Sequence, residues 1–176
     1  MKFDNKENPV IIEKGSGKKY FHSRSVAVVA MLSCNMVSNT NSVLIVQRGP
    51  DLDNAGKWCL PCGYLDWNET VEEAVIREVY EETNINLNKI ILKRGASLKL
   101  LDLMSDPEKD KLQNIRAVYG FEFLRSEMLD LDICNKNCPN EIVNHMWWNG
   151  KGRPPGGWAF GHHLDASFYI ESLNKK

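Results

Sequence analysis

The stretch that decides the fold is GYLDWNETVEEAVIREVYEETNI, which runs from Gly63 to Ile85. Acidic residues crowd this stretch, and its only basic residue is Arg77. Thr70 and Glu73 form an S/T-x-x-E capping box, which predicts that a helix begins directly after Thr70. Asn84 tolerates the left-handed conformation that commonly ends a helix, so the predicted helix ends there.

Three valines one turn apart form an apolar stripe on this helix at about 100° per residue: Val71, Val75 and Val79. Glu78 and Glu82 lie beside the stripe, and their like charges at i, i+4 destabilise an isolated helix by about 0.2–0.5 kcal/mol. A solvated acidic face explains the charge, but not its place beside the valines. Carboxylates at a buried edge are costly unless they are paired or coordinated. Oxygen ligands of this kind suit Mg²⁺, and Mn²⁺ fits them as well.

The same residues resemble the signature of the Nudix hydrolases, G-x5-E-x7-R-E-U-x-E-E-x-G-U, where U is a bulky aliphatic residue. The matching positions are Gly63, Glu69, Arg77, Glu78, Val79, Glu81, Glu82 and Ile85. The one departure is Asn84, where the family has glycine. The resemblance implies an α+β fold, the Nudix-type α/β/α sandwich with a mixed β-sheet.

The resemblance also implies a metal site for Mg²⁺ or Mn²⁺. Glu78 and Glu82 are expected to be ligands, and Glu81 a ligand or the catalytic base that activates water. The backbone carbonyl of Cys62 is expected to add a ligand. A divalent cation held in this way neutralises phosphate oxygens and activates water for attack on phosphorus.

Arg77 and Glu69 are the other two candidate catalytic residues. The resemblance implies that Arg77 pairs with Glu69 and orients the carboxylates. A plain scaffold salt bridge between them is an equally open interpretation.

The implied reaction is hydrolysis of a phosphoanhydride bond in a nucleoside diphosphate linked to another moiety. Nucleotide sugars, ADP-ribose and nucleoside triphosphates all remain open as substrates. The alternative is a non-catalytic binding module that keeps the fold and senses a nucleotide. The intact glutamates at positions 78, 81 and 82 disfavour that alternative. The chain contains no G-x4-G-K-[ST] loop, so a P-loop nucleotide site has no support.

The composition is that of an ordinary globular protein, with 176 residues, 43% hydrophobic residues and a formal charge of −1. Residues 1–20 are predicted to be a polar arm, and residues 21–176 a single Nudix domain. A broad nucleic-acid surface is not expected at this charge. The longest apolar run, Val26–Leu32, is too short to cross a membrane. The polar N-terminus lacks a signal peptide's apolar centre, so a cytoplasmic location is expected. A homodimer is left open.

Five cysteines do not favour a disulfide framework, because the number is odd. Cys59 and Cys62 stand where the family commonly shows W-x-L-P-G-G, and Cys134 and Cys138 form a second close pair. A structural zinc held by four cysteines is conceivable. Alternation along a strand would separate the first two thiols, so reduced cysteines without a metal are the favoured interpretation.

The sequence of the rest of the chain predicts several strands and one more helix. The expected strands are residues 25–33, 43–48, a strand ending at Gly63, 97–103, 117–124 and 142–148. The segment 164–173 is expected to be a terminal helix with Leu164, Phe168 and Leu173 on one side.

Three residues are candidate substrate contacts. Arg48 ends its strand just before the loop to the predicted metal site, where a guanidinium suits a phosphate. The glycine- and proline-rich loop 150–158 carries Arg153 and ends in Trp158, which is a candidate for stacking on a base. A surface arginine and a core tryptophan are the competing interpretations.

Two adjacent pairs complete the candidates. Trp147 and Trp148 are expected to point to opposite faces of a strand. His162 and His163 are candidate acids or bases near the phosphates, and a structural role is the favoured interpretation for both.

Overall fold

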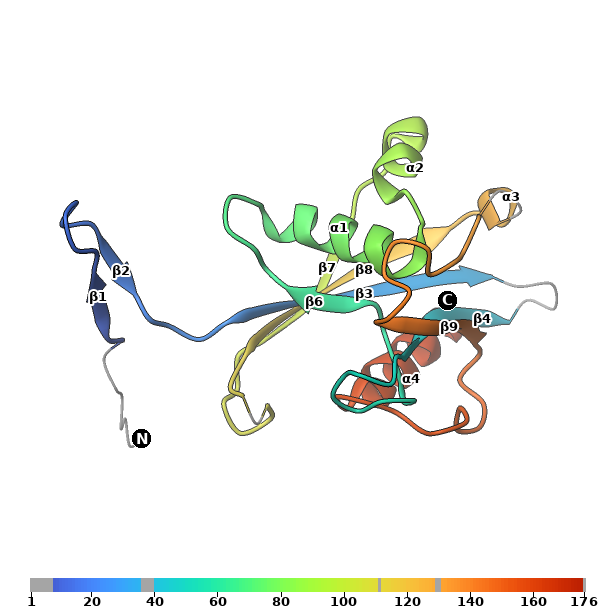
Figure 1. The fold of residues 1–176 in the computed structure, drawn as a ribbon. Coiled ribbons are helices and arrows are strands. Elements are labelled where there is room, and N and C mark those ends of the chain that lie inside the picture. Colours follow the sequence, from blue (N-terminus) through green and yellow to red (C-terminus); the bar gives the residue numbers. More distant parts are fainter. Residues whose placement is uncertain (1–7, 36–39, 111, 129–130, 176) are drawn as a thin grey trace.

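The computed structural model describes residues 8–35, 40–110, 112–128 and 131–175. Within these ranges a seven-stranded mixed sheet lies between helices, and a separate two-stranded hairpin precedes it (Figure 1). The hairpin strands are β1 (Val10–Ile12) and β2 (Lys19–Phe21). The sheet strands are β3 (Val26–Asn35), β4 (Asn41–Arg48), β5 (Trp58–Cys59), β6 (Cys62–Tyr64), β7 (Lys99–Met104), β8 (Ile115–Phe123) and β9 (Ile142–Trp148). The helices are α1 (Val71–Thr83), α2 (Leu87–Arg94), α3 (Arg125–Met128) and α4 (His162–Asn174).

Strand β3 is the centre of the sheet and divides the core into two layers. It pairs parallel with β8 and antiparallel with β4 and β6. Alternate side chains such as Val28 and Leu32 pack with α1, whereas Val29 and Met31 pack on the opposite face with residues of α4. Figure 1 shows α1 and α4 on opposite sides of the sheet. The predicted sandwich with a mixed sheet is therefore confirmed.

Helix α1 begins and ends where the sequence predicts. The Thr70 side chain accepts from the backbone N–H of Glu73 at 3.2 Å, and the Glu73 carboxylate accepts from the Thr70 N–H at 2.7 Å. Asn84 ends the helix in the left-handed conformation with φ 61°. Val75 and Val79 are buried against the sheet. The capping box and the C-terminal asparagine thus fix the two ends of the helix that carries the glutamates.

Helix α2 was not predicted, because its apolar run is short and lies just before the strand expected at residues 97–103. The Asn86 side chain caps it by accepting from the N–H of Lys89 at 2.9 Å, and Gly95 ends it in the left-handed conformation. The asparagine before the run and the glycine after it are the boundary signals that distinguish a short helix from a strand.

The single strand expected before Gly63 is two short strands. Pro61 has no N–H to donate to a neighbouring strand, so the ladder is interrupted there. The Pro61 carbonyl accepts from Ala30 at 2.8 Å, and the Leu60 N–H turns to the Nδ1 atom of His162 at 3.1 Å. Strand β5 therefore pairs with β4, and β6 pairs with β3.

The terminal helix α4 is confirmed, but its predicted apolar side is wrong. Leu164 and Phe168 are 66% and 77% exposed. The buried residues are instead His162, Ala166 and Ile170. Residues 162, 166 and 170 lie one turn apart, so the small side chain of Ala166 lets α4 approach the sheet closely.

The segment predicted as a polar N-terminal arm contains most of the β1–β2 hairpin. Its residues Val10 and Phe21 are 50% and 70% exposed, and Figure 1 shows the hairpin apart from the sheet. Tyr20 makes an edge-to-face contact with Trp67, with ring centroids 6.1 Å apart. Among the described residues, no helix is long and apolar enough to cross a membrane.

Candidate active site

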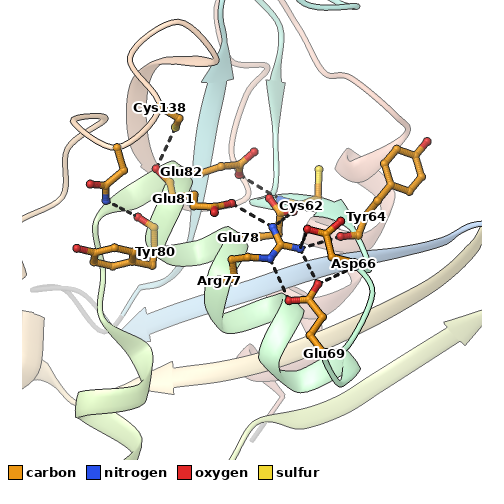
Figure 2. A network of polar contacts seen from close by, with 11 residues as sticks. Cys62, Tyr64, Asp66, Glu69, Arg77, Glu78, Tyr80, Glu81, Glu82 and Cys138 are labelled. Atoms are coloured by element: carbon orange, nitrogen blue, oxygen red, sulfur yellow. Dashed lines mark hydrogen bonds and ion pairs between the residues drawn. The ribbon is translucent and has the colours of Figure 1, made fainter.

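Arg77 is the centre of the polar network in Figure 2. Its Nε and Nη2 atoms donate to the two carboxylate oxygens of Glu69 at 3.0 and 2.8 Å. Its Nη1 donates to Glu78 at 2.7 Å and to Glu81 at 3.1 Å, and Nη2 also donates to the Tyr64 carbonyl at 2.9 Å. Hydrogen bonds from Arg77 lower the pKa of the Glu69 carboxyl. One guanidinium therefore holds the loop before α1 against the helix and fixes two of the three glutamates.

Glu82 is the glutamate that Arg77 does not reach. It is 5% exposed, and it accepts the Cys62 N–H at 3.1 Å. Among the described residues it forms no ion pair. Burial, with the nearby Cys59 and Glu78 side chains, raises the pKa of Glu82 well above its usual range. A buried carboxylate with one hydrogen bond needs a cation to stabilise its ionised form.

Glu78 resembles Glu82 in that burial affects its carboxyl. Burial raises the pKa of its carboxyl, although hydrogen bonding from Arg77 opposes the rise. A Cβ atom added at Gly63 would overlap the Glu78 carboxylate, so β6 approaches this side chain as closely as a backbone can. Figure 2 shows Glu78, Glu81 and Glu82 gathered near Cys62. We call these three residues the glutamate cluster.

The C-terminal turn of α1 is held by a distant segment, residues 134–145, which no sequence pattern placed there. The last four carbonyls of a helix have no partner within it. Here the carbonyls of residues 80 to 83 accept, in order, from Asn137 Nδ2 at 2.9 Å, Cys138 Sγ at 2.9 Å, His145 Nε2 at 2.8 Å and Cys134 N at 3.2 Å. These contacts fix the turn that carries Glu81 and Glu82. Partners about sixty positions apart leave no local pattern by which to find them.

The residues present fit a divalent cation. The Glu78 and Glu82 carboxyl groups are half-buried and buried, and Glu81 is about half exposed, with 47% of its side chain accessible. The donors are carboxylate oxygens, which Mg²⁺ and Mn²⁺ prefer. The burial of the Glu82 carboxyl is the observation that supports the fit, because this group forms no ion pair in the described chain and a bound cation would stabilise its ionised form.

Arg48 is the last residue of β4. Its Nε donates to the Asp53 carbonyl at 2.7 Å, and its guanidinium lies 4.7 Å from the centroid of the Phe160 ring. Its positive charge opposes the rise in the pKa of Glu82. The charge of Arg48 therefore acts on the predicted metal site, and its contact with a phosphate stays a prediction.

The structure gives less support to a substrate role for loop 150–158 than for Arg48. Trp158 packs edge-to-face on Trp148, with centroids 4.9 Å apart, and it forms a β-bridge with Trp58. This geometry favours a packing role over stacking on a base. Arg153 is exposed and its guanidinium lies against Gly157. A substrate role for Arg153 stays a prediction.

In each adjacent pair, the tryptophans 147 and 148 and the histidines 162 and 163, the two side chains lie in different environments. Trp147 packs with Phe123 on the α1 face, and Trp148 lies in the core on the α4 face, as alternation predicts. His162 is buried, and burial together with the charges of Arg116 and Arg48 lowers its pKa to about 3. A neutral, buried imidazole agrees with the structural interpretation, whereas His163 is exposed.

With this geometry in hand, the comparisons with known proteins identify the family. The model of the NUDIX domain matches residues 23–149, and the chain belongs to this family. The chain is 33% identical over 118 residues to the ADP-ribose pyrophosphatase of Methanocaldococcus jannaschii. That match covers 66% of this chain and 62% of the relative, so the chain spans less than two thirds of that protein's length. A putative nudix hydrolase 1 of Caenorhabditis elegans is 34% identical over 71 residues, 40% of this chain and 19% of that protein.

Solved structures agree on the fold. The NUDIX domain of Shewanella oneidensis NrtR, in complex with ADP ribose, superimposes with a TM-score of 0.63 and 19% identity, over 86% of this chain and 89% of that one. A bifunctional NMN adenylyltransferase/ADP ribose pyrophosphatase from Francisella tularensis, in complex with AMP and a Mn ion, gives a TM-score of 0.62 and 24% identity. That alignment covers 85% of this chain and 42% of the other.

Proposed function

We propose that this protein is a metal-dependent pyrophosphohydrolase that cleaves a phosphoanhydride bond in a nucleoside diphosphate linked to another moiety. The observation that carries the proposal is Glu82, a buried carboxylate without an ion-pair partner in the described chain, beside two further glutamates on the same helix. A divalent cation bound there supplies charge neutralisation for phosphate oxygens and activation of water.

The chain's own residues position that chemistry. Glu78 and Glu82 would hold the cation, with the carbonyl of Cys62 as a further oxygen donor. Glu81, which is the most accessible of the glutamate cluster, would serve as a ligand or accept the proton from water. Arg77 keeps Glu78 and Glu81 in place, since it donates to both of them. Phosphoryl transfer needs mainly this positioning and charge stabilisation.

ADP-ribose is the substrate that we propose to test first. The curated relative from Methanocaldococcus jannaschii is named an ADP-ribose pyrophosphatase, and the NUDIX domain of NrtR was solved with ADP ribose. Arg48, whose positive charge acts on Glu82 and whose guanidinium forms no ion pair with a carboxylate in the described chain, is the cation that we propose for the phosphate, because Arg77 is engaged by carboxylates. Hydrolysis of ADP-ribose would yield AMP and ribose 5-phosphate.

A substrate panel tests this function. Purified protein is incubated with ADP-ribose, nucleotide sugars and nucleoside triphosphates, each with Mg²⁺ or Mn²⁺, and the products are separated by chromatography. We expect hydrolysis of at least one nucleoside diphosphate derivative that stops when a chelator is added. Binding without turnover across the panel would instead favour a nucleotide-sensing module, and turnover that resists the chelator would contradict the metal site.

The raised pKa of Glu82 predicts how Mg²⁺ stabilises the fold. In the metal-free protein this carboxyl keeps its proton to a higher pH when folded than when unfolded. Its contribution to stability is therefore complete below the unfolded pKa, near 4.5, and is lost as the pH rises through the folded pKa. Because a cation binds the ionised carboxylate, Mg²⁺ should raise the Tm more at about pH 8 than at about pH 5.

Thermal unfolding with and without Mg²⁺ at both pH values measures this effect. Glu82→Gln is the control, because a neutral amide removes the titration. In that variant we expect a smaller shift with Mg²⁺ at the higher pH, and a metal-free Tm that equals or exceeds that of the wild type. Equal Mg²⁺ shifts at both pH values in the wild type would contradict the assignment of Glu82 as a ligand.

A further inference from the structure

A second group of metal-binding side chains lies beside the glutamate cluster. Cys59 on β5, Cys62 on β6 and His162 at the start of α4 each offer one ligand atom, and these atoms all lie within 4.8 Å of one another. Cys59 and His162 are buried, with 0% and 2% exposure, and both cysteines are free thiols. We call these three residues the thiol–imidazole cluster.

Two features of the fold bring the cluster together. The break in the strand at Pro61 places both thiols on one side, although alternation along a continuous strand would separate them. This corrects the sequence argument against a metal at this pair. The segment before α4 is fastened to β5, because the Ala159 N–H donates to the Trp58 carbonyl at 2.8 Å and the Trp58 N–H donates to Gly157 at 2.9 Å. His162 is thereby held next to Cys59 and Cys62.

The donor set selects a different metal from that of the glutamate cluster. Two sulfurs and one imidazole nitrogen suit Zn²⁺, whereas Mg²⁺ and Mn²⁺ prefer oxygen. In a tetrahedral site with Zn–S bonds of about 2.3 Å, two sulfurs lie about 3.8 Å apart. Ligand atoms within 4.8 Å of one another therefore need to close by about 1 Å at most. Two thiolates would also balance the charge of a buried dication.

The imidazole of His162 has its lone pair on the correct side for this role. Its Nδ1 accepts the Leu60 N–H at 3.1 Å, so the proton is on Nε2 and the Nδ1 lone pair is engaged by that N–H. Leu60 lies between the two cysteines in the chain, so this lone pair points at the turn that carries both thiols. A metal would take the place of one N–H hydrogen bond.

We propose that Cys59, Cys62 and His162 bind a thiophilic divalent metal, Zn²⁺ in the first instance, with one coordination position left for water or another small ligand. This site shares Cys62 with the proposed oxygen-ligand site but uses its thiol rather than its backbone carbonyl, and it does not depend on the proposed hydrolysis. It ties the turn between β5 and β6 to the start of α4. Since the Cys62 N–H binds Glu82, the metal would also fix the backbone next to that glutamate.

Cobalt spectroscopy tests the proposal on the full chain, purified under reducing conditions and freed of metal. Titration with Co²⁺ should give one equivalent of a species with a thiolate-to-cobalt charge-transfer band and the intense visible bands of tetrahedral cobalt. Addition of Zn²⁺ should bleach both. Cys59→Ser and His162→Asn should each weaken binding at least tenfold. The asparagine can still accept the Leu60 N–H, so the second variant keeps the local hydrogen bond.

Two controls separate this site from other thiols and from the glutamate cluster. Cys134→Ser removes a thiol elsewhere and should leave the bands unchanged. Glu82→Gln should keep the thiolate bands whether or not the protein hydrolyses nucleotides, because oxygen ligands give no such band. Absence of the bands in the wild type, their persistence in Cys59→Ser and His162→Asn, or a Cys59–Cys62 disulfide in place of bound metal would overturn the proposal.

Discussion

Glu82→Gln is expected to lower chelator-sensitive hydrolysis at least about tenfold, which is a loss of about 1.4 kcal/mol or more in transition-state stabilisation. The amide keeps the shape of the side chain and still accepts the Cys62 N–H, which the wild-type carboxylate accepts at 3.1 Å. It removes only the negative charge. Glu82 is the buried carboxyl of the glutamate cluster that has no ion-pair partner in the described chain, so we expect a bound cation to balance its negative charge.

Glu73→Gln is the matched control for this experiment. Glu73 is on the same helix and is exposed, and glutamine at that position can still complete the capping box with Thr70. Both variants lose one charge from α1, so a general effect of helix charge would appear in both. Steady-state rates at saturating Mg²⁺, with circular dichroism to check the fold, measure the difference. Equal activity in Glu82→Gln and the wild type would remove Glu82 from the metal site.

Local sequence signals predicted helix α1, which carries the glutamate cluster. The capping box at Thr70 and the left-handed residue Asn84 act within a few positions of the chain, so the ends of α1 could be found from sequence. The buried face of α4 could not be predicted from the sequence. Its apolar residues Leu164 and Phe168 are exposed, and the helix instead buries Ala166, because close approach to the sheet matters more there than side-chain size.

The surroundings of the glutamate cluster depend on long-range contacts that no local pattern records. His145 caps the carbonyl of Glu82, although it lies 63 positions away and gave no usable signal. Cys59, Cys62 and His162 illustrate the same limit, because the break at Pro61 reverses the expected separation of the thiols. Sequence therefore located the acidic helix, but it did not reveal what holds the helix end or what lies beside it.

Arg77→Met is expected to reduce both stability and activity. The guanidinium donates to Glu69, Glu78 and Glu81, and its side chain is 27% exposed, against 15% for Glu69 and 13% for Glu78. Methionine leaves the two less exposed carboxylates without a counter-charge, which should lower the free energy of unfolding by about 3 kcal/mol. Activity should fall at least about tenfold, because Glu78 and Glu81 lose the contact that positions them. Denaturant unfolding and steady-state kinetics measure the two effects.

The response to Mg²⁺ distinguishes the two interpretations of the Arg77–Glu69 pair. Mg²⁺ should recover part of the lost stability in Arg77→Met, because a cation relieves the charge of Glu78 but not that of Glu69. Arg94→Met is the matched control: Arg94 is 25% exposed and pairs with Glu127 at 3.1 Å, away from the glutamate cluster. It should lose stability that Mg²⁺ does not restore, with activity unchanged. If Arg77→Met behaves like Arg94→Met in all three measurements, the pair is only a scaffold salt bridge, and Arg77 has no part in positioning the glutamates.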